Sequence, residues 1–439
     1  MNLACLYRKI LPEKIRTLLH LGILRDNIIE LCRISTISYL QRRALRKLKK
    51  KDRIRCVFLG LFSEVWKYDD IYKIMESNPR FDPIIVVCPI VNYGYDNMLR
   101  RMDDCYRYFK QKGYHVIKSY DSQIQKYIDL QKDIKPDILF YTNPYKDLID
   151  DRYFITEVSK VLTVYVPYYF NEGVAYKVAY DTLFQNLLWR RYVETDFHKN
   201  LSKTYGRNHG RNSVVTGYPG IEKFLNTTSE LNDSCWKIKS NRLKRIIWAP
   251  HHTLQAVGTC HYSCFLQYCD IMVNFAQKYK DEAQFVFKPH PLLRNKLDLL
   301  WGKEKTDAYY ALWDHMPNTS LRDGEYTGLF MTSDAMIHDS GSFLIEYLYV
   351  NKPVLRTLND VPLEDLYNQF ALRCLDQYYK AKNEHDIELF IQNIINDVDP
   401  LKEQRTNFVN EVLIPKGSPS QNIINDILDS IDNQILYRN

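Results

Sequence analysis

Short apolar runs alternate with longer segments of helical period along most of the chain. In the first half, the pattern predicts strands at 56–62, 83–88, 115–117, 137–141, 162–166 and 214–216, with helices at 68–76, 95–113 and 122–134. A chain that alternates strands with helices in this way usually builds a parallel sheet covered by helices. We therefore predict α/β architecture, with a first Rossmann-like lobe over residues 53–225.

A second alternating series follows, with strands predicted at 245–249, 284–288, 336–338 and 354–356 and helices at 263–280 and 292–301. Between the two series lie Gly217-Tyr218-Pro219-Gly220 and a polar stretch, 226–241, with little periodicity. Such a stretch indicates a link between lobes. We predict a second doubly wound lobe over 242–418, with ligand sites at the carboxyl ends of strands that face the cleft between the lobes.

Both ends of the chain predict helices. Residues 1–52 form a basic extension with apolar residues near helical spacing, and residues 419–439 form a C-terminal helix with an apolar stripe. Residues 42 to 55 contain Arg42, Arg43, Arg46, Lys47, Lys49, Lys50, Lys51, Arg53 and Arg55, opposed only by Asp52. The extension can lie on an anionic membrane surface or pack as a lid on the first lobe, and the sequence leaves both open.

Composition narrows the class of protein. The chain has 439 residues, 45% of them hydrophobic and 13% aromatic, which is enough for a folded protein of two or three domains. The ten cysteines show no Cys-x-x-Cys pair, so reduced thiols are expected, and no metal is predicted although Cys260, His261, Cys264 and Cys269 lie close in sequence. Gly-x-Gly-x-x-Gly and Walker-type loops are absent, which argues against a dinucleotide oxidoreductase or a nucleotide triphosphatase.

The net charge of +7 does not indicate a nucleic-acid partner, because the basic run carries too few aromatic residues for a stacking surface. The sequence has no run of about 18 uncharged apolar residues, and the charged N-terminus does not fit a secretory signal. We therefore expect a cytoplasmic protein that is peripheral at the inner face of the cell membrane.

Three motifs each follow a predicted strand of the second lobe. They are Trp248-Ala249-Pro250-His251-His252-Thr253, Phe287-Lys288-Pro289-His290-Pro291, and the turn Ser340-Gly341-Ser342. Because the carboxyl ends of parallel strands meet at one edge of a sheet, we expect the three to gather. The turn precedes a helix, where free backbone N–H groups favour phosphate, and Glu346 lies one turn further on, within reach of a ribose. Ordinary helix capping and structural histidines are the alternatives.

The order of these motifs resembles the CDP-glycerol:poly(glycerol phosphate) glycerophosphotransferases of teichoic acid and capsule synthesis. Family members end one strand in a hydrophobic residue followed by Ala-Pro-Thr, and here Trp248-Ala249-Pro250 match before His251-His252 intervene. Lys288-Pro289-His290-Pro291 matches their Lys-x-His-Pro, and Gly217-Tyr218-Pro219 matches the end of their first lobe. Their Asp-x-Ser-Ser, later acidic residue and Lys-Pro are matched by Asp339, Ser340, Gly341, Ser342, Glu346, Lys352 and Pro353, with Gly for one Ser and Glu for Asp.

The resemblance implies a GT-B-like fold and transfer of glycerol-phosphate, or a related polyol-phosphate, from a CDP-linked donor to a hydroxyl of a cell-surface polysaccharide or teichoic-acid-like acceptor, with release of CMP. It assigns donor binding to Lys288, His290, Ser340, Gly341, Ser342 and Glu346, and it implies no cofactor. Two alternatives stay open. One is a GT-B glycosyltransferase that uses a nucleotide-activated sugar, and the other is a catalytically silent binding subunit.

One departure concerns the base that activates the acceptor. Family members carry Trp-His-Gly-Thr-Pro in the first lobe, whereas this chain has Val166-Pro167-Tyr168-Tyr169-Phe170-Asn171-Glu172-Gly173 at that place. A carboxylate in a cleft can accept a proton when its pKa suits the pH. The candidates for catalysis are therefore Glu172, His251, His252 and His290.

Overall fold

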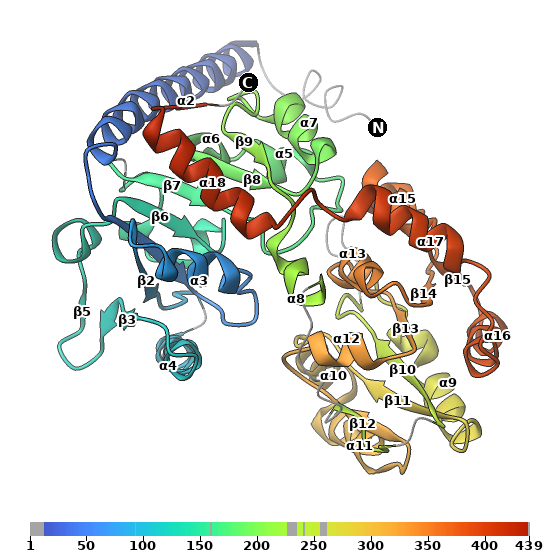
Figure 1. Ribbon diagram of the computed structural model, residues 1–439. Coiled ribbons are helices and arrows are strands. Elements are labelled where there is room, and N and C mark those ends of the chain that lie inside the picture. Colours follow the sequence, from blue (N-terminus) through green and yellow to red (C-terminus); the bar gives the residue numbers. More distant parts are fainter. Residues whose placement is uncertain are drawn as a thin grey trace.

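The chain folds around two parallel sheets, as Figure 1 shows. The computed structural model describes residues 13–92, 94–158, 160–225, 235–239, 242–254 and 261–437, with side chains from residue 29 onward. Most of the predicted link at 226–241 and Cys260 of the weighed metal set lie outside the described residues. The predicted GT-B-like pattern of two α/β lobes is present.

The first sheet has seven parallel strands in the order β3-β2-β1-β6-β7-β8-β9. Their bounds are β1 Ile54–Gly60, β2 Phe81–Val87, β3 Val116–Lys118, β6 Ile138–Tyr141, β7 Leu162–Tyr165, β8 Arg190–Val193 and β9 Ser213–Val215. Helices α3 (Asp69–Ser77), α4 (Tyr95–Gln111), α5 (Tyr176–Tyr180), α6 (Leu183–Leu187) and α7 (Asp196–Tyr205) connect them. Strands β1, β2, β6 and β7 are buried along nearly their whole length, which explains their continuous apolar runs.

The second sheet has six parallel strands in the order β12-β11-β10-β13-β14-β15. They are β10 Lys244–Ala249, β11 Ala283–Phe287, β12 Thr319–Leu321, β13 Ala335–His338, β14 Val354–Thr357 and β15 Tyr379–Ala381. The strand order reverses between β10 and β13, and ligands of open α/β sheets bind at such a switch point. The segments after these two strands carry His251 and Ser340 respectively.

Helices surround the second sheet. They are α8 (Glu222–Leu225), α9 (Phe265–Lys278), α10 (Leu293–Trp301), α11 (Lys303–His315), α12 (Thr327–Thr332), α13 (Phe343–Glu346), α14 (Leu363–Leu366), α15 (Gln369–Leu375), α16 (Glu384–Ile395) and α17 (Lys402–Phe408), with short turns η6 (Tyr347–Val350) and η7 (Val409–Leu413). Trp248, Phe265, Phe287 and Trp313 stack in one of the cores of this lobe.

The helix predicted at 122–134 is wrong. The chain there forms a short antiparallel pair, β4 (Tyr120–Asp121) with β5 (Lys126–Tyr127), and only Leu130–Ile134 makes a π-turn. Asp121 accepts the N–H groups of Gln123 and Ile124, and Gln125 has a φ of +49°. An Asp side chain that binds the backbone two and three residues on favours a turn over a helix.

Strand β8 was missed because Arg190-Arg191 indicates a surface segment. In the structure the Arg190 side chain is fully buried, and its guanidinium donates to Asp426 (2.9 Å) and to the carbonyl oxygen of Leu436 (2.6 Å). Both partners belong to the C-terminal segment, where helix α18 (Pro419–Asp432) lies against the first lobe (Figure 1). The chain therefore returns from the second lobe to complete the core of the first.

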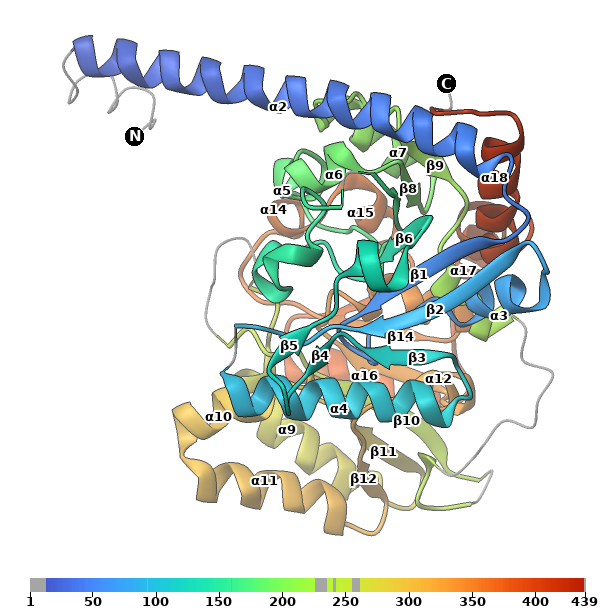
Figure 2. The ribbon, with the colours of Figure 1, turned by 90° about the vertical axis from the view of Figure 1, so that its left-hand side faces the viewer.

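Residues 13–48 form one helix, α2 (Glu13–Leu48). Its C-terminal part packs on the first lobe through Ile34, Leu45 and Leu48. Its N-terminal part extends past the body of the molecule (Figure 2). None of the helices in the described part of the chain combines the length and the apolar character needed to cross a membrane.

Candidate functional site at the carboxyl ends of β10, β11 and β13

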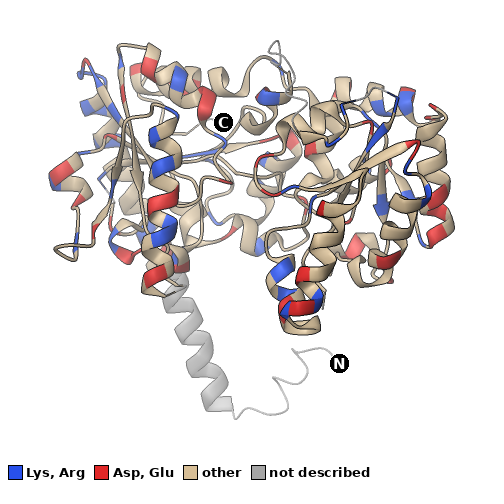
Figure 3. Ribbon diagram, turned by 90° about the horizontal axis from the view of Figure 1, so that it is seen from below, with Lys and Arg blue, Asp and Glu red and all other residues tan. Residues whose placement is uncertain are grey.

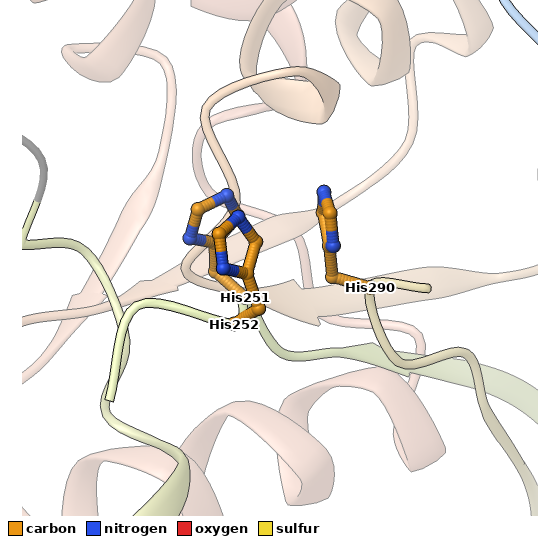
Figure 4. Close-up of side chains that lie close together, drawn as sticks. All are labelled: His251, His252 and His290. Atoms are coloured by element: carbon orange, nitrogen blue, oxygen red, sulfur yellow. The ribbon is translucent and has the colours of Figure 1, made fainter. Parts of the chain in front are cut away.

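Three histidines gather where two neighbouring strands end (Figure 4). His251 and His252 follow β10 and His290 follows β11, and their ring centroids lie 4.2 to 4.9 Å apart. The backbone fixes this arrangement, because the N–H of His290 donates to the carbonyl of Pro250 at 3.0 Å and the N–H of His251 donates to Asp339. The predicted meeting of the two His motifs therefore occurs.

Hydrogen bonds assign the tautomers of two of these rings. His290 Nδ1 accepts the N–H of Leu292 at 3.1 Å, so in the neutral ring the proton lies on Nε2. The N–H of Thr253 donates to His251 Nδ1 at 3.4 Å, so this nitrogen is an acceptor. The Thr253 hydroxyl lies 3.0 Å from the same nitrogen and donates to it, because its oxygen accepts the N–H groups of Tyr262 at 2.9 Å and Ser263 at 3.3 Å. Both rings are left with an Nε2–H donor, which suits an anionic ligand.

All three histidines are neutral at physiological pH. Burial lowers the pKa of His251 to about 2, with a further contribution from His252 and His290 beside it. Burial likewise lowers the pKa of His252 to about 4 and that of His290 to about 3. The nitrogens of the trio lie within 4.8 Å of one another, close enough for a transition-metal site. However, an Nε2 that carries a proton cannot bind a metal, so the hydrogen bonds favour an anion.

The Ser340-Gly341-Ser342 turn follows β13 and lies beside the histidines, because Asp339 binds the N–H of His251. The second oxygen of Asp339 accepts the N–H of Cys264, at 2.6 Å. Ser340 and Gly341 are buried and Ser342 is exposed. The turn is therefore held from both sides, with one serine free to meet a ligand.

Arg356 also holds this turn, and sequence reasoning missed it. Its buried guanidinium donates from Nη1 to the Ser340 carbonyl (2.8 Å) and from Nη2 to the Tyr367 hydroxyl (2.6 Å). The buried Nε of Arg356 has no hydrogen-bond partner among the described residues. The signal that could have found it is an arginine inside the short apolar strand that follows Lys352-Pro353.

Glu172 of the first lobe reaches the same turn. An ideal Cβ built on Gly341 would lie 2.5 Å from Glu172 Oε1, so the glycine leaves the room that the carboxyl group occupies. The N–H of Asn368 donates to the Glu172 carbonyl at 2.7 Å, and Gly173 forms an antiparallel bridge with Tyr367. Burial raises the pKa of Glu172 to about 8, although the positive charge of Arg356 opposes this.

A histidine of the first lobe, His198, lies near Glu172 but is already engaged. Its Nε2 lies 3.2 Å from the Asn171 carbonyl and its Nδ1 lies 2.8 Å from the Thr195 hydroxyl. The Asn171 carbonyl also accepts the amide of Asn368 at 2.6 Å. His198 therefore positions the loop that carries Glu172 and does not replace the missing histidine of the family motif.

Glu346 and Lys288 meet at another point, the ring of Tyr326. Both oxygens of the buried Glu346 carboxylate are occupied, one by the Tyr218 hydroxyl at 2.8 Å and the other by the Tyr326 hydroxyl. Lys67 of the first lobe lies 3.5 Å from Glu346 and donates to Tyr326. Lys288 donates to the Gly324 carbonyl and lies 5.5 Å from the Tyr326 ring. The predicted contact of Glu346 with a ribose stays a prediction. In this structure the hydroxyls of Tyr218 and Tyr326 bind the carboxylate oxygens that would meet the ribose hydroxyls.

Comparison with known proteins agrees with the motifs. Residues 192–381 match the family model described as CDP-Glycerol:Poly(glycerophosphate) glycerophosphotransferase. The predicted family resemblance is confirmed. A curated relative is the teichoic acid poly(ribitol-phosphate) polymerase of Bacillus spizizenii, 23% identical over 246 residues that cover 50% of this chain and 36% of the polymerase. The match thus spans little more than a third of that relative, while the glycerophosphotransferase match covers the whole histidine and serine site.

Solved structures show the fold. UDP-GlcNAc 2-epimerase from Neisseria meningitidis has a TM-score of 0.54 at 16% identity, over 86% of this chain and 100% of that chain. Another UDP-N-acetylglucosamine 2-epimerase has a TM-score of 0.55 at 14% identity, over 89% of this chain and 99% of that chain. At such low identity the likeness concerns architecture alone, and it confirms the predicted GT-B-like fold.

Proposed function

We propose that this protein transfers glycerol-phosphate, or a related polyol-phosphate, from a CDP-linked donor to a hydroxyl of a cell-surface polysaccharide or teichoic-acid-like acceptor. We also place it in the cytoplasm, peripheral at the inner face of the membrane, where such an acceptor is built. One observation carries the proposal. Two of the places where the chain departs from the family pattern, Glu172 and Gly341, face each other across the lobes.

Binding of the CDP-linked donor rests on neutral and cationic hydrogen-bonding groups of the protein. His251 and His290 each offer an Nε2–H, and Ser342 adds an exposed hydroxyl beside them. Such donors, fixed by the backbone before the ligand arrives, stabilise the negative charge that grows on a leaving phosphate. We assign the pyrophosphate of the donor to this group, with Lys288 supplying positive charge nearby.

The acceptor half rests on Glu172. Its carboxylate takes the proton of the acceptor hydroxyl, the hydroxyl oxygen bonds to the distal phosphorus, and the bond from that phosphorus to the CMP oxygen breaks. CMP leaves with the electron pair of that bond. A pKa of about 8 makes Glu172 a stronger base than His251 or His252, whose pKa values burial lowers to about 2 and about 4.

The test measures nucleotide release, CMP from the cytidine donors and UDP from the UDP-sugars, with a panel of donors and a polyol-phosphate primer as acceptor. The panel consists of CDP-glycerol, CDP-ribitol, CMP-Kdo and UDP-sugars. We expect CMP from a CDP-polyol and labelled product on the primer, both lost in Glu172→Gln. Turnover of CMP-Kdo or a UDP-sugar alone would favour glycosyl transfer, and binding without turnover of any donor would favour a silent subunit.

A further inference from the structure

A pocket lies between helix α2 and the first lobe, away from the site described above. Its volume is about 440 Å³, which falls within the range of ligand pockets. The helix supplies the apolar Leu40, Ala44 and Leu48 and the cationic Arg43 and Lys47. The lobe supplies the remaining walls, including Lys160. Apolar and cationic side chains from two different elements thus face one cavity.

The positive charge of this pocket is not neutralised by the residues that the structure describes. Its acidic residue, Asp137, is already bound by Lys51 and by the N–H of Arg55 at 2.8 Å. Among the described residues, none forms a salt bridge with Arg43, Lys47 or Lys160. Over the rest of the ribbon, Lys and Arg are interspersed with Asp and Glu (Figure 3). Three cations around an apolar floor therefore form a site for an anionic group joined to an apolar one.

The helix that walls the pocket also exposes apolar side chains. Leu31 is 52% exposed and Tyr39 is 59% exposed, on the part of α2 just before the pocket. Aromatic and aliphatic side chains beside lysines and arginines are typical of a helix at a membrane surface. Helix α2 runs along the side of the first lobe that is remote from the second lobe, so the second lobe does not cover this stretch (Figures 1 and 2).

We propose that the pocket binds the headgroup of an anionic phospholipid. The phosphate lies among Arg43, Lys47 and Lys160, and the adjoining glycerol and first methylenes contact Leu40 and Ala44. Lys160 is decisive because it lies on the lobe, so the lipid joins α2 to the body of the protein. The inference rests on the proposed function only through the membrane location, and the chemistry at Glu172 is independent of it.

The experiment uses the full chain and vesicles of phosphatidylcholine with or without phosphatidylglycerol, in a cosedimentation assay. Lys160→Glu is expected to weaken binding to the anionic vesicles by about tenfold or more, since each cation near such a surface contributes on the order of 1 kcal/mol. Lys280→Glu, an exposed lysine after α9 in the second lobe, is the matched control and should change nothing. Equal binding by the two variants would overturn the proposal.

A second variant distinguishes binding of the lipid in the pocket from general electrostatic attraction of the protein to an anionic surface. Ala44→Trp fills the cavity and keeps every charge, so it should abolish saturable binding of a soluble short-chain phosphatidylglycerol. CMP release with a water-soluble primer reports whether the variants are folded and whether the transferase proposal holds, separately from lipid binding. Wild-type protein that binds inorganic phosphate as tightly as the lipid, or neither ligand, would refute a headgroup site.

Discussion

The carboxyl group of Glu172 fills the space that a side chain at Gly341 would need, since a Cβ on the glycine would lie 2.5 Å from the glutamate Oε1. The Gly341→Ser variant, which restores the serine of the family motif, should therefore displace the Glu172 carboxyl group. We expect kcat to fall by at least about tenfold with a smaller change in donor KM, because misplacing a base removes transition-state stabilisation. Adding Gly341→Ser to Glu172→Gln should cause no further loss in kcat. A full additional loss would show that the glycine serves another purpose.

Glu172 should govern the pH dependence of turnover. Its pKa is raised to about 8, so at pH 7 most molecules hold the carboxyl group protonated and unable to accept a proton. The kcat should therefore rise nearly tenfold per pH unit below 8 and level off above it. Glu172→Gln should lose about 10² to 10⁴ in kcat and lose this limb of the profile. A profile that is flat between pH 6 and 9 in the parent enzyme would reject Glu172 as the base.

His290 should act as a donor from Nε2. The Leu292 N–H fixes the tautomer, and a glutamine amide can place an N–H close to the same position. His290→Ala should weaken CMP binding and lower kcat/KM by about 10²-fold or more, the usual cost of one lost donor to developing charge. His290→Gln should recover part of that loss. Isothermal titration with CMP and steady-state kinetics measure both, and equal defects in the two variants would contradict a donor role.

Lys67 should stabilise the contact between the two lobes. Its ammonium group lies 3.5 Å from the Glu346 carboxylate, and the two side chains are only 7% and 5% exposed. Lys67→Met removes the salt-bridge partner of that buried carboxylate and leaves Lys223 as a remaining positive neighbour, so we expect the free energy of unfolding to fall by at most about 3 kcal/mol. Lys67→Met with Glu346→Gln should recover part of it, while Lys132→Met at an exposed site should be neutral. Urea titration measures all three.

His251 should make the protein less stable in mild acid. Its pKa is about 2 in the folded state, against about 6.5 in an unfolded chain, so below pH 6.5 only the unfolded state takes up the proton. Stability is therefore complete above pH 6.5 and declines as the pH falls. His251→Gln should remove up to about 1.4 kcal/mol per pH unit from the slope between pH 6 and 4. An unchanged slope would mean that the imidazole is charged in the folded protein.

Strands such as β1 and β11 could be predicted because a buried parallel strand consists largely of consecutive apolar residues. Strand β8 was missed because a side chain in it binds a distant partner. Arg190 lies in a strand because residues of the C-terminal helix bind it, and nothing near it in sequence reports that. The helix predicted at 122–134 failed for a local reason, the turn that Asp121 caps.

The sequence by itself determined the two α/β lobes and the three motifs of the second lobe, because apolar periodicity and strand-end position are local properties of the chain. Only the tertiary structure decided the rest of the site. It brought Glu172 against Gly341 across the lobes, placed Arg356 behind Ser340, and occupied Glu346 with two tyrosine hydroxyls. These contacts join residues far apart in the chain, and which of them form depends on how the two sheets pack, a property that no short stretch of sequence carries.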